Sequence, residues 1–192
     1  MSTAASAALS NAGLTVLSEE EELFRASVRE FAEGEVRPKV EQMEHASKLD
    51  ADLIKHCFEL GLMAIESPEE YGGAGSTIFN AILAIEELAR VDASVSVFVD
   101  VHNTLVTNAF MRWANDEQKK KYLPDLASGK RLGAFTITEP EAGSNPLEMT
   151  STYRRDGDRF LLSGVKYLIS NGAIADAVVA FAYPEGAQGP EK

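Results

Sequence analysis

The chain has 192 residues, of which 45% are hydrophobic, so it can bury a sizeable core and is not a disordered chain. The 30 acidic and 18 basic residues give a formal charge of −12, which argues against nucleic acid or an anionic membrane surface as the main partner. Cys57 is the only cysteine, which excludes an internal disulfide and a cysteine-based metal site and suits a reducing, cytoplasmic compartment.

Residues 1–17 are mostly small and polar, and we expect them to form a flexible tail. They lack the basic start and apolar run of a secretory signal, and they lack the arginines of a mitochondrial presequence. No apolar run approaches the roughly 20 residues that span a bilayer, so we expect a soluble protein without membrane insertion.

The stretch from Ser18 to Pro38 has the pattern of an amphipathic helix. Ser18 and Glu21 have the spacing of a capping box, and four glutamates in a row stand where the helix dipole favours negative charge. Apolar residues then recur on one face, and Pro38 predicts the end of the helix.

Apolar periodicity predicts three further helices. They cover residues 50–60, 76–90 and 93–113. Gly61 is expected to stop the first, and Asp92 is a good N-cap for the third, which is apolar nearly all round and should be buried on several sides. A short basic amphipathic turn then begins at Asp116 and is closed by Pro124.

After Lys130 the apolar pattern changes from helical to alternating. The stretches predicted as strands are "RLGAFTIT", "MTSTYRR", "RFLLSGVKYLIS" and "ADAVVAFAY". An Asp156-Gly157 turn between two of them is a strong hairpin signal. Helices followed by strands predict an α+β fold, with an all-α domain over residues 18–130 and the start of an antiparallel β domain over residues 131–192.

Few side chains in this pattern suggest hydrolytic or metal chemistry. His45 and His56 stand on or beside polar helix faces, where we expect them to be solvated. His102 stands in the apolar helix, where a hydrogen-bonded core or pocket histidine is expected. There is no HExxH or GxSxG motif, and the paired carboxylates look like helix surface, so neither a metal site nor a hydrolase is favoured.

Two stretches in the strand region remain as candidates for a binding site. They are "FTITEPEAGSN", residues 135–145, and "KYLISNG", residues 166–172. Each combines an expected strand, a hydroxyl near its end and a glycine-containing turn. Taken alone, each is also compatible with an ordinary β-turn.

Together with three earlier motifs, these stretches resemble the acyl-CoA dehydrogenase family. The motifs, in order, are "PEEYGGAG" at 68–75, "EELARVDAS" at 86–94, "EQKKKYLPDLASG" at 117–129, "TEPEAGSN" at 138–145 and "KYLISNG" at 166–172. The match covers nearly the whole chain, and the run after residue 86 looks most like the short- and branched-chain members.

The resemblance implies an FAD enzyme that oxidises an acyl-CoA to the trans-2-enoyl-CoA. A carboxylate base removes the α-proton, the β-hydrogen leaves as hydride, and an electron-transfer flavoprotein receives the electrons. It also implies a homo-oligomer, a tetramer or dimer of dimers. The family's catalytic glutamate belongs to a C-terminal four-helix domain, so we expect the base beyond Lys192 and no catalytic residue within this chain.

The resemblance also suggests which residues bind the cofactor and the substrate. The implied FAD-binding residues are Phe135, Thr136, Ile137, Thr138, Gly143, Ser144, Leu168, Ile169 and Ser170. The implied substrate-binding residues are Ser144 at the CoA part and Val97 and Val101 in the helix that walls the acyl chain, for which plain core packing is an equal alternative.

Two positions depart from the family pattern. Leu168 stands where the family often has tryptophan, and Glu141 replaces the usual glycine and is expected to point to solvent. Leu168 favours, weakly, an alternative function as a flavin-dependent oxidase or monooxygenase. A non-catalytic remnant that binds a partner subunit or acyl-CoA is a third possibility.

Overall fold

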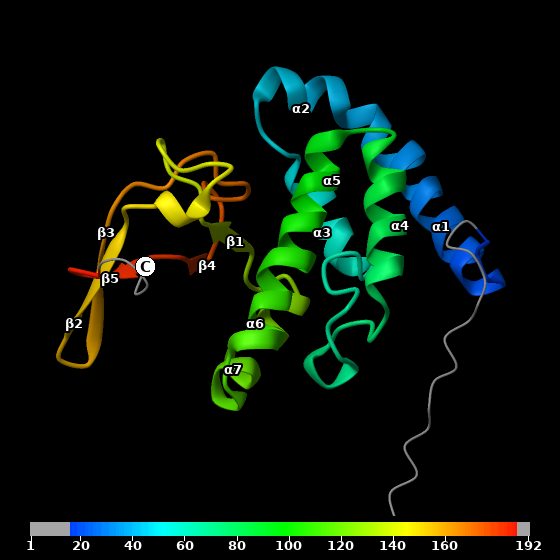
Figure 1. The fold of residues 1–192 in the computed structure, drawn as a ribbon. Coiled ribbons are helices and arrows are strands. Elements are labelled where there is room, and N and C mark those ends of the chain that lie inside the picture. Colours follow the sequence, from blue (N-terminus) through cyan, green and yellow to red (C-terminus); the bar gives the residue numbers. More distant parts are fainter. Residues whose placement is uncertain (1–15, 188–192) are drawn as a thin grey trace, which may run out of the picture.

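The computed structural model describes residues 16–187, so the predicted tail over residues 1–17 lies almost wholly outside the described residues. Helices and strands occupy separate parts of the molecule (Figure 1). The strands lie on the left of the view and the α-helices on the right, and the strand Gly133–Thr136 (β1) lies beside the π-helical segment Val101–Thr107. The expected order of a helical part followed by a smaller sheet part is confirmed.

The α-helices of the described residues are α1 (Glu19–Phe31), α2 (Val40–Ala46), α3 (Ala51–Glu59), α4 (Ile78–Ala89), α5 (Ala93–Asp100), α6 (Asn108–Trp113) and α7 (Asp116–Ala127). Short 3₁₀ turns cover Arg37–Lys39, Glu69–Tyr71 and Pro146–Glu148, and π-helical segments cover Ala32–Val36 and Val101–Thr107. Side-chain caps begin several of the helices, because Ser18, Asp50, Asp92 and Asn115 each accept a hydrogen bond from a backbone N–H of the first turn.

The first helix follows the predicted start but not the predicted end. Ser18 and Glu21 form the expected capping box. Pro38 does not end the helical path, which runs on through the π-helical segment and a 3₁₀ turn into α2. Proline is tolerated there because it occupies the first turn of the short 3₁₀ segment, where its missing N–H removes no helical bond.

The prediction that Pro124 closes the helical turn from Asp116 is also wrong. Pro124 lies inside α7, which continues to Ala127 rather than closing at the proline. Leu123 and Leu126 on either side of it are fully buried, and this burial offsets the lost backbone bond. The helix ends near Gly129, whose φ of +77° favours glycine.

The strands form two small sheets. They are β1 (Gly133–Thr136), β2 (Thr152–Asp156), β3 (Arg159–Ser163), β4 (Ala177–Ala180) and β5 (Tyr183–Pro184). The predicted hairpin is confirmed as the antiparallel pair β2/β3, closed by Gly157 with a φ of +65°. The other pairs, β1/β4 and β2/β5, are parallel, so the expectation of antiparallel pairing holds only for the hairpin. Long connections join each parallel pair and permit this direction.

Two apolar clusters hold the molecule together. The larger lies among the helices, around Leu53, Cys57 and Leu88, and includes Leu132 just before β1. The smaller is built on Val101, Val106 and Leu126, with Phe135, Ala177 and Val179 packed against it from β1 and β4. The second cluster fixes the sheet β1/β4 on the helical part, which positions the end of β1.

Candidate functional site at the end of β1

The segment 166–172 is a loop and not the predicted strand. Leu168 and Asn171 have φ values of +53° and +64°, which no strand contains. Asparagine adopts this conformation readily, whereas leucine does so at a cost of roughly 1–2 kcal/mol per residue. The loop therefore turns back on itself beside β1.

Contacts to the β1 region fix the loop at both ends. At its start, the backbone N–H of Tyr167 donates to the Thr138 carbonyl over 2.9 Å. Near its end, Nδ2 of Asn171 donates to the Gly133 carbonyl over 3.2 Å. The stretches 135–145 and 166–172 thus lie side by side. Leu168, Ile169 and Ser170 form the part of the loop between the two contacts.

Glu139, the residue after Thr138, is a buried carboxylate. The sequence pattern indicated only that a strand ends there. Oε2 of Glu139 accepts hydrogen bonds from the backbone N–H and the hydroxyl of Thr150, at 2.6 and 2.8 Å. Its Oε1 accepts from the Ser151 N–H and from Lys166 Nζ, both at 2.9 Å. Burial alone raises the pKa of Glu139, but these donors outweigh it and hold the pKa well below the usual range.

The strand β1 is two residues shorter than predicted at each end, so Ile137 and Thr138 follow it outside the sheet. Phe135 faces the smaller apolar cluster, and the Thr136 hydroxyl donates to the Val179 carbonyl of β4. Within residues 16–187 the hydroxyl of Thr138 makes no hydrogen bond to another protein group. Thr138 is therefore the residue at this end whose side chain is available to a ligand.

A cavity of about 400 Å³ brings together two residues predicted for different roles. It is lined by Leu49, Ala93, Ser94, Val97, Phe98, Ser170 and Asn171. Val97 is 44% exposed in the helical wall, and Ser170 faces it from the loop. Among the described residues the Ser170 hydroxyl also has no protein partner.

The remaining predicted site residues lie apart from this cavity. Val101 is buried in the smaller apolar cluster and packs against β1 and β4. Ile169 lines a larger cavity of about 750 Å³, which residues of α3 also line. Leu168 is 77% exposed, and Gly143 and Ser144 are exposed on the loop that follows the isolated bridge Glu139–Ala142.

His102 joins the helical part to the start of β1. Its Nδ1 accepts from the Gly133 N–H over 3.2 Å, so Nε2 carries the hydrogen and donates to the Leu126 carbonyl over 3.0 Å. Burial lowers the pKa of His102 to about 4, which keeps the ring neutral at pH 7. The expected core histidine is confirmed, and its role is to support β1.

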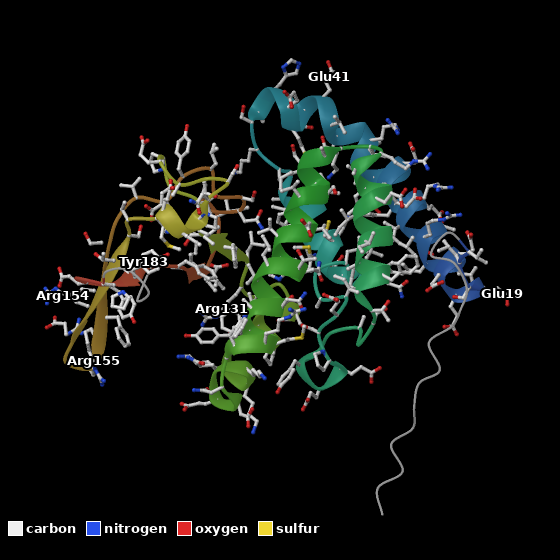
Figure 2. The ribbon with its side chains drawn as sticks, viewed as in Figure 1. Glu19, Glu41, Arg131, Arg154, Arg155 and Tyr183 are labelled. Atoms are coloured by element: carbon white, nitrogen blue, oxygen red, sulfur yellow. The ribbon has the colours of Figure 1, made fainter. Side chains whose placement is uncertain are left out.

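Arg131, labelled in Figure 2, marks the junction just before β1. Its Nε lies 2.9 Å from Asp125 Oδ2, and its guanidinium stands over the Tyr122 ring. Next to it, Asp176 accepts from the Leu132 N–H over 2.9 Å and so holds the start of β4 against β1. These contacts make the base of the site rigid.

Comparisons with known proteins identify the family. The model "Acyl-CoA dehydrogenase, N-terminal domain" matches residues 18–130, and "Acyl-CoA dehydrogenase, middle domain" matches residues 134–192. The chain belongs to the acyl-CoA dehydrogenase family. An acyl-CoA dehydrogenase of Bacillus subtilis is 42% identical over 90% of this chain, which covers 46% of that relative. The mitochondrial short/branched chain specific acyl-CoA dehydrogenase of Bos taurus is 38% identical over 89% of the chain and 39% of the relative.

Solved structures agree with this assignment. A glutaryl-CoA dehydrogenase of Mycobacterium smegmatis in complex with FADH2 has a TM-score of 0.83 and 35% identity, over 88% of this chain and 44% of that one. The chain therefore spans less than half the length of these relatives. Within residues 16–187, no helix is long and apolar enough to cross a membrane, and no three His, Cys, Asp or Glu side chains are grouped to hold a metal ion.

The chemistry of the residues at the end of β1 fits a flavin. The free hydroxyls of Thr138 and Ser170 can donate to or accept from the polar edge of an isoalloxazine ring. Val97 and Phe98 give the neighbouring cavity an apolar wall. A Cβ added at Gly143 would meet nothing within 4 Å, so the loop there is open to a large group.

Proposed function

We propose that this chain supplies the N-terminal half of an FAD-dependent acyl-CoA dehydrogenase that acts on a short- or branched-chain acyl-CoA. The observation that carries the proposal is the joining of the two motif stretches at the end of β1, where Thr138 and Ser170 keep their hydroxyls free. The names of the relatives support the reaction class, and those of the short/branched chain members support the substrate class.

In this proposal the chain's residues bind and orient, and they do not remove the proton. FAD, when bound, supplies the acceptor for the hydride. Thr138 and Ser170 hold its polar edge, Leu168 covers the ring, and Gly143 and Ser144 meet the phosphates and the CoA part. Val97 forms the wall for the acyl chain, and Val101, buried in the smaller apolar cluster, supports the sheet β1/β4 instead of contacting the substrate.

The one strongly buried carboxylate near these hydroxyls is unsuited to act as the base. Glu139 is held ionised by four donors, and accepting a proton would break bonds that its charge now makes. The base, the remaining FAD contacts and the homo-oligomer are therefore assigned to the half of the relatives' length that this chain does not cover. Residues 1–192 alone are expected not to turn over acyl-CoA, and dye reduction by them would contradict this.

An electron-transfer flavoprotein is the proposed electron acceptor, as the family resemblance implies. A cytoplasmic location stays a prediction, supported by the lone Cys57, which is buried and unpaired.

The decisive experiment is an anaerobic titration of the full-length protein with short and branched acyl-CoA substrates, followed by bleaching of the flavin absorbance. Thr138→Val and Ser170→Ala should each weaken FAD binding about tenfold, because each removes one hydrogen bond to a charged or strongly polar group. Thr104→Val is the matched control, because that hydroxyl donates to Asp100 and its loss should leave FAD affinity within about twofold.

The exposed Leu168 supports a second candidate function. A leucine that is 77% exposed, in place of an aromatic side chain, leaves more room for oxygen to approach a reduced flavin. A flavin oxidase or monooxygenase would consume oxygen and reoxidise rapidly in air, whereas a dehydrogenase would need the electron-transfer protein. A protein that shows no bleaching with any acyl-CoA would instead favour a non-catalytic partner-binding role.

A further inference from the structure

Glu139 and Lys166 form the most deeply buried ion pair within residues 16–187. Their side chains are 3% and 16% exposed, and Lys166 Nζ lies 2.9 Å from Glu139 Oε1. A buried ion pair adds little net stability, because the desolvation of both charges offsets their attraction. Net stability therefore does not explain why this pair is buried here.

The pair ties three separate segments to one point. Lys166 Nζ also donates to the Ile137 carbonyl over 3.0 Å, one residue before Thr138. Glu139 binds the backbone of Thr150 and Ser151, which lead into β2. The segment before Thr138, the segment after it and the start of the 166–172 loop thus meet at the same two side chains.

The geometry of the loop depends on this point. Tyr167, next to Lys166, donates to the Thr138 carbonyl, and Asn171 holds the far end. Between them, Leu168 is kept at a φ of +53°, which a leucine does not adopt without restraint. With both ends of the loop held in this way, Ser170 lines the cavity beside Val97.

We propose that the Glu139–Lys166 pair is a positioning device that sets the loop bearing Ser170 against Thr138, so that both hydroxyls meet one flavin. The inference rests on the proposed function. Neither residue is a catalytic residue, because the polar atoms of both are hydrogen-bonded to other protein groups. The pair fixes the spacing between the loop that bears Ser170 and Thr138. Its two charges cancel, so it adds no net charge that would alter the electrostatics of a redox cofactor.

The test replaces the lysine. Lys166→Met keeps most of the length of the side chain and removes the tie, while Glu139 retains its three donors from Thr150 and Ser151. Lys166→Arg keeps the charge and should restore the tie. Arg154→Met is the matched control, because Arg154 pairs with Glu185 at 3.9 Å with both side chains exposed.

Two measurements are made on the holoenzyme and its variants. The dissociation constant and absorption spectrum of FAD report on the site, and hydrogen exchange of the amides of 167–172 reports on the loop. For Lys166→Met we expect FAD affinity to fall about tenfold or more, with a shifted flavin spectrum, and exchange in the loop to quicken about tenfold while the helices are unchanged. Lys166→Arg should recover FAD affinity to within about threefold of the wild-type protein, and Arg154→Met should not differ from it.

FAD affinity of Lys166→Met within about twofold of the wild type, with the same spectrum, overturns the inference whatever the exchange result. A variant that does not fold is replaced by Glu139→Gln with Lys166→Met, which leaves no unpaired charge, and the same criteria apply. If the wild-type protein binds no FAD, the proposed function fails in that control, before any variant is compared.

Discussion

The neutral His102 makes the stability of this protein depend on pH in a predictable direction. The ring is fully buried, accepts from the Gly133 N–H and donates to the Leu126 carbonyl. A second proton would place an N–H against the Gly133 N–H and a charge in the core. The folded state therefore resists protonation, which the unfolded chain accepts at an ordinary histidine pKa.

The magnitude follows from the two pKa values. The folded pKa of His102 is about 4, and the unfolded value is about 6.5. Because the unfolded chain binds more protons between these values, the free energy of unfolding falls as the pH falls from 6.5 to 4 and is unaffected by this group above 6.5. A difference of about 2.5 units corresponds to a loss of about 3 kcal/mol, at about 1.4 kcal/mol per unit.

The assay is urea unfolding, monitored by circular dichroism at several pH values from 7 to 4, for the wild type and His102→Gln. Glutamine can still donate to Leu126, and it cannot titrate. All other titrating groups are shared by the two proteins, so the difference between their curves of unfolding free energy against pH isolates the contribution of His102. His102→Gln should be less stable at pH 7 by about 1–3 kcal/mol, through the unpaired Gly133 N–H, and the gap should close or reverse near pH 4. Parallel curves, with a gap that changes by less than about 0.5 kcal/mol, would refute the reasoning.

Two further predictions concern packing and charge in the helical part. Gly133→Ala should cost about 2 kcal/mol or more in urea unfolding, because the added methyl would overlap the Val106 side chain at the junction of β1 with the helices. Gly143→Ala, whose methyl would meet open space, is the control and should change stability by less than about 0.5 kcal/mol, and equal effects would contradict the packing argument. Arg29→Met should cost about 2–3 kcal/mol, because it largely strands the carboxylate of Glu87, which is 3% exposed, accepts from Arg29 at 2.6 and 2.8 Å and would keep only the longer pair with Arg90 at 3.9 Å. The double change Arg29→Met with Glu87→Met should recover part of that loss, and a double variant no more stable than the single one would count against the stranded charge.

The sequence by itself determined the features that depend on neighbours a few residues apart. The capping box of Ser18 and Glu21, the cap at Asp92 and the hairpin at Gly157 are each closed within about four residues, so their residue types suffice to predict them. The order of helices before strands followed from the change of apolar period. The motifs, which are also local in the chain, indicated the family correctly.

The tertiary structure decided everything that joins distant segments. Pro124 lies inside a helix because burial of Leu123 and Leu126 outweighs a local rule, and Pro38 lies in a helical path because it falls in the first turn of a 3₁₀ segment. The parallel pairing of β1 with β4 joins Gly133 to Ala177, and no pattern within either strand encodes that partner. The Glu139–Lys166 pair was missed for the same reason, since a glutamate before a proline and a lysine at a loop start look like surface residues. Both side chains are desolvated only when the chain folds, and the opposite charge of each then offsets the cost of burying the other.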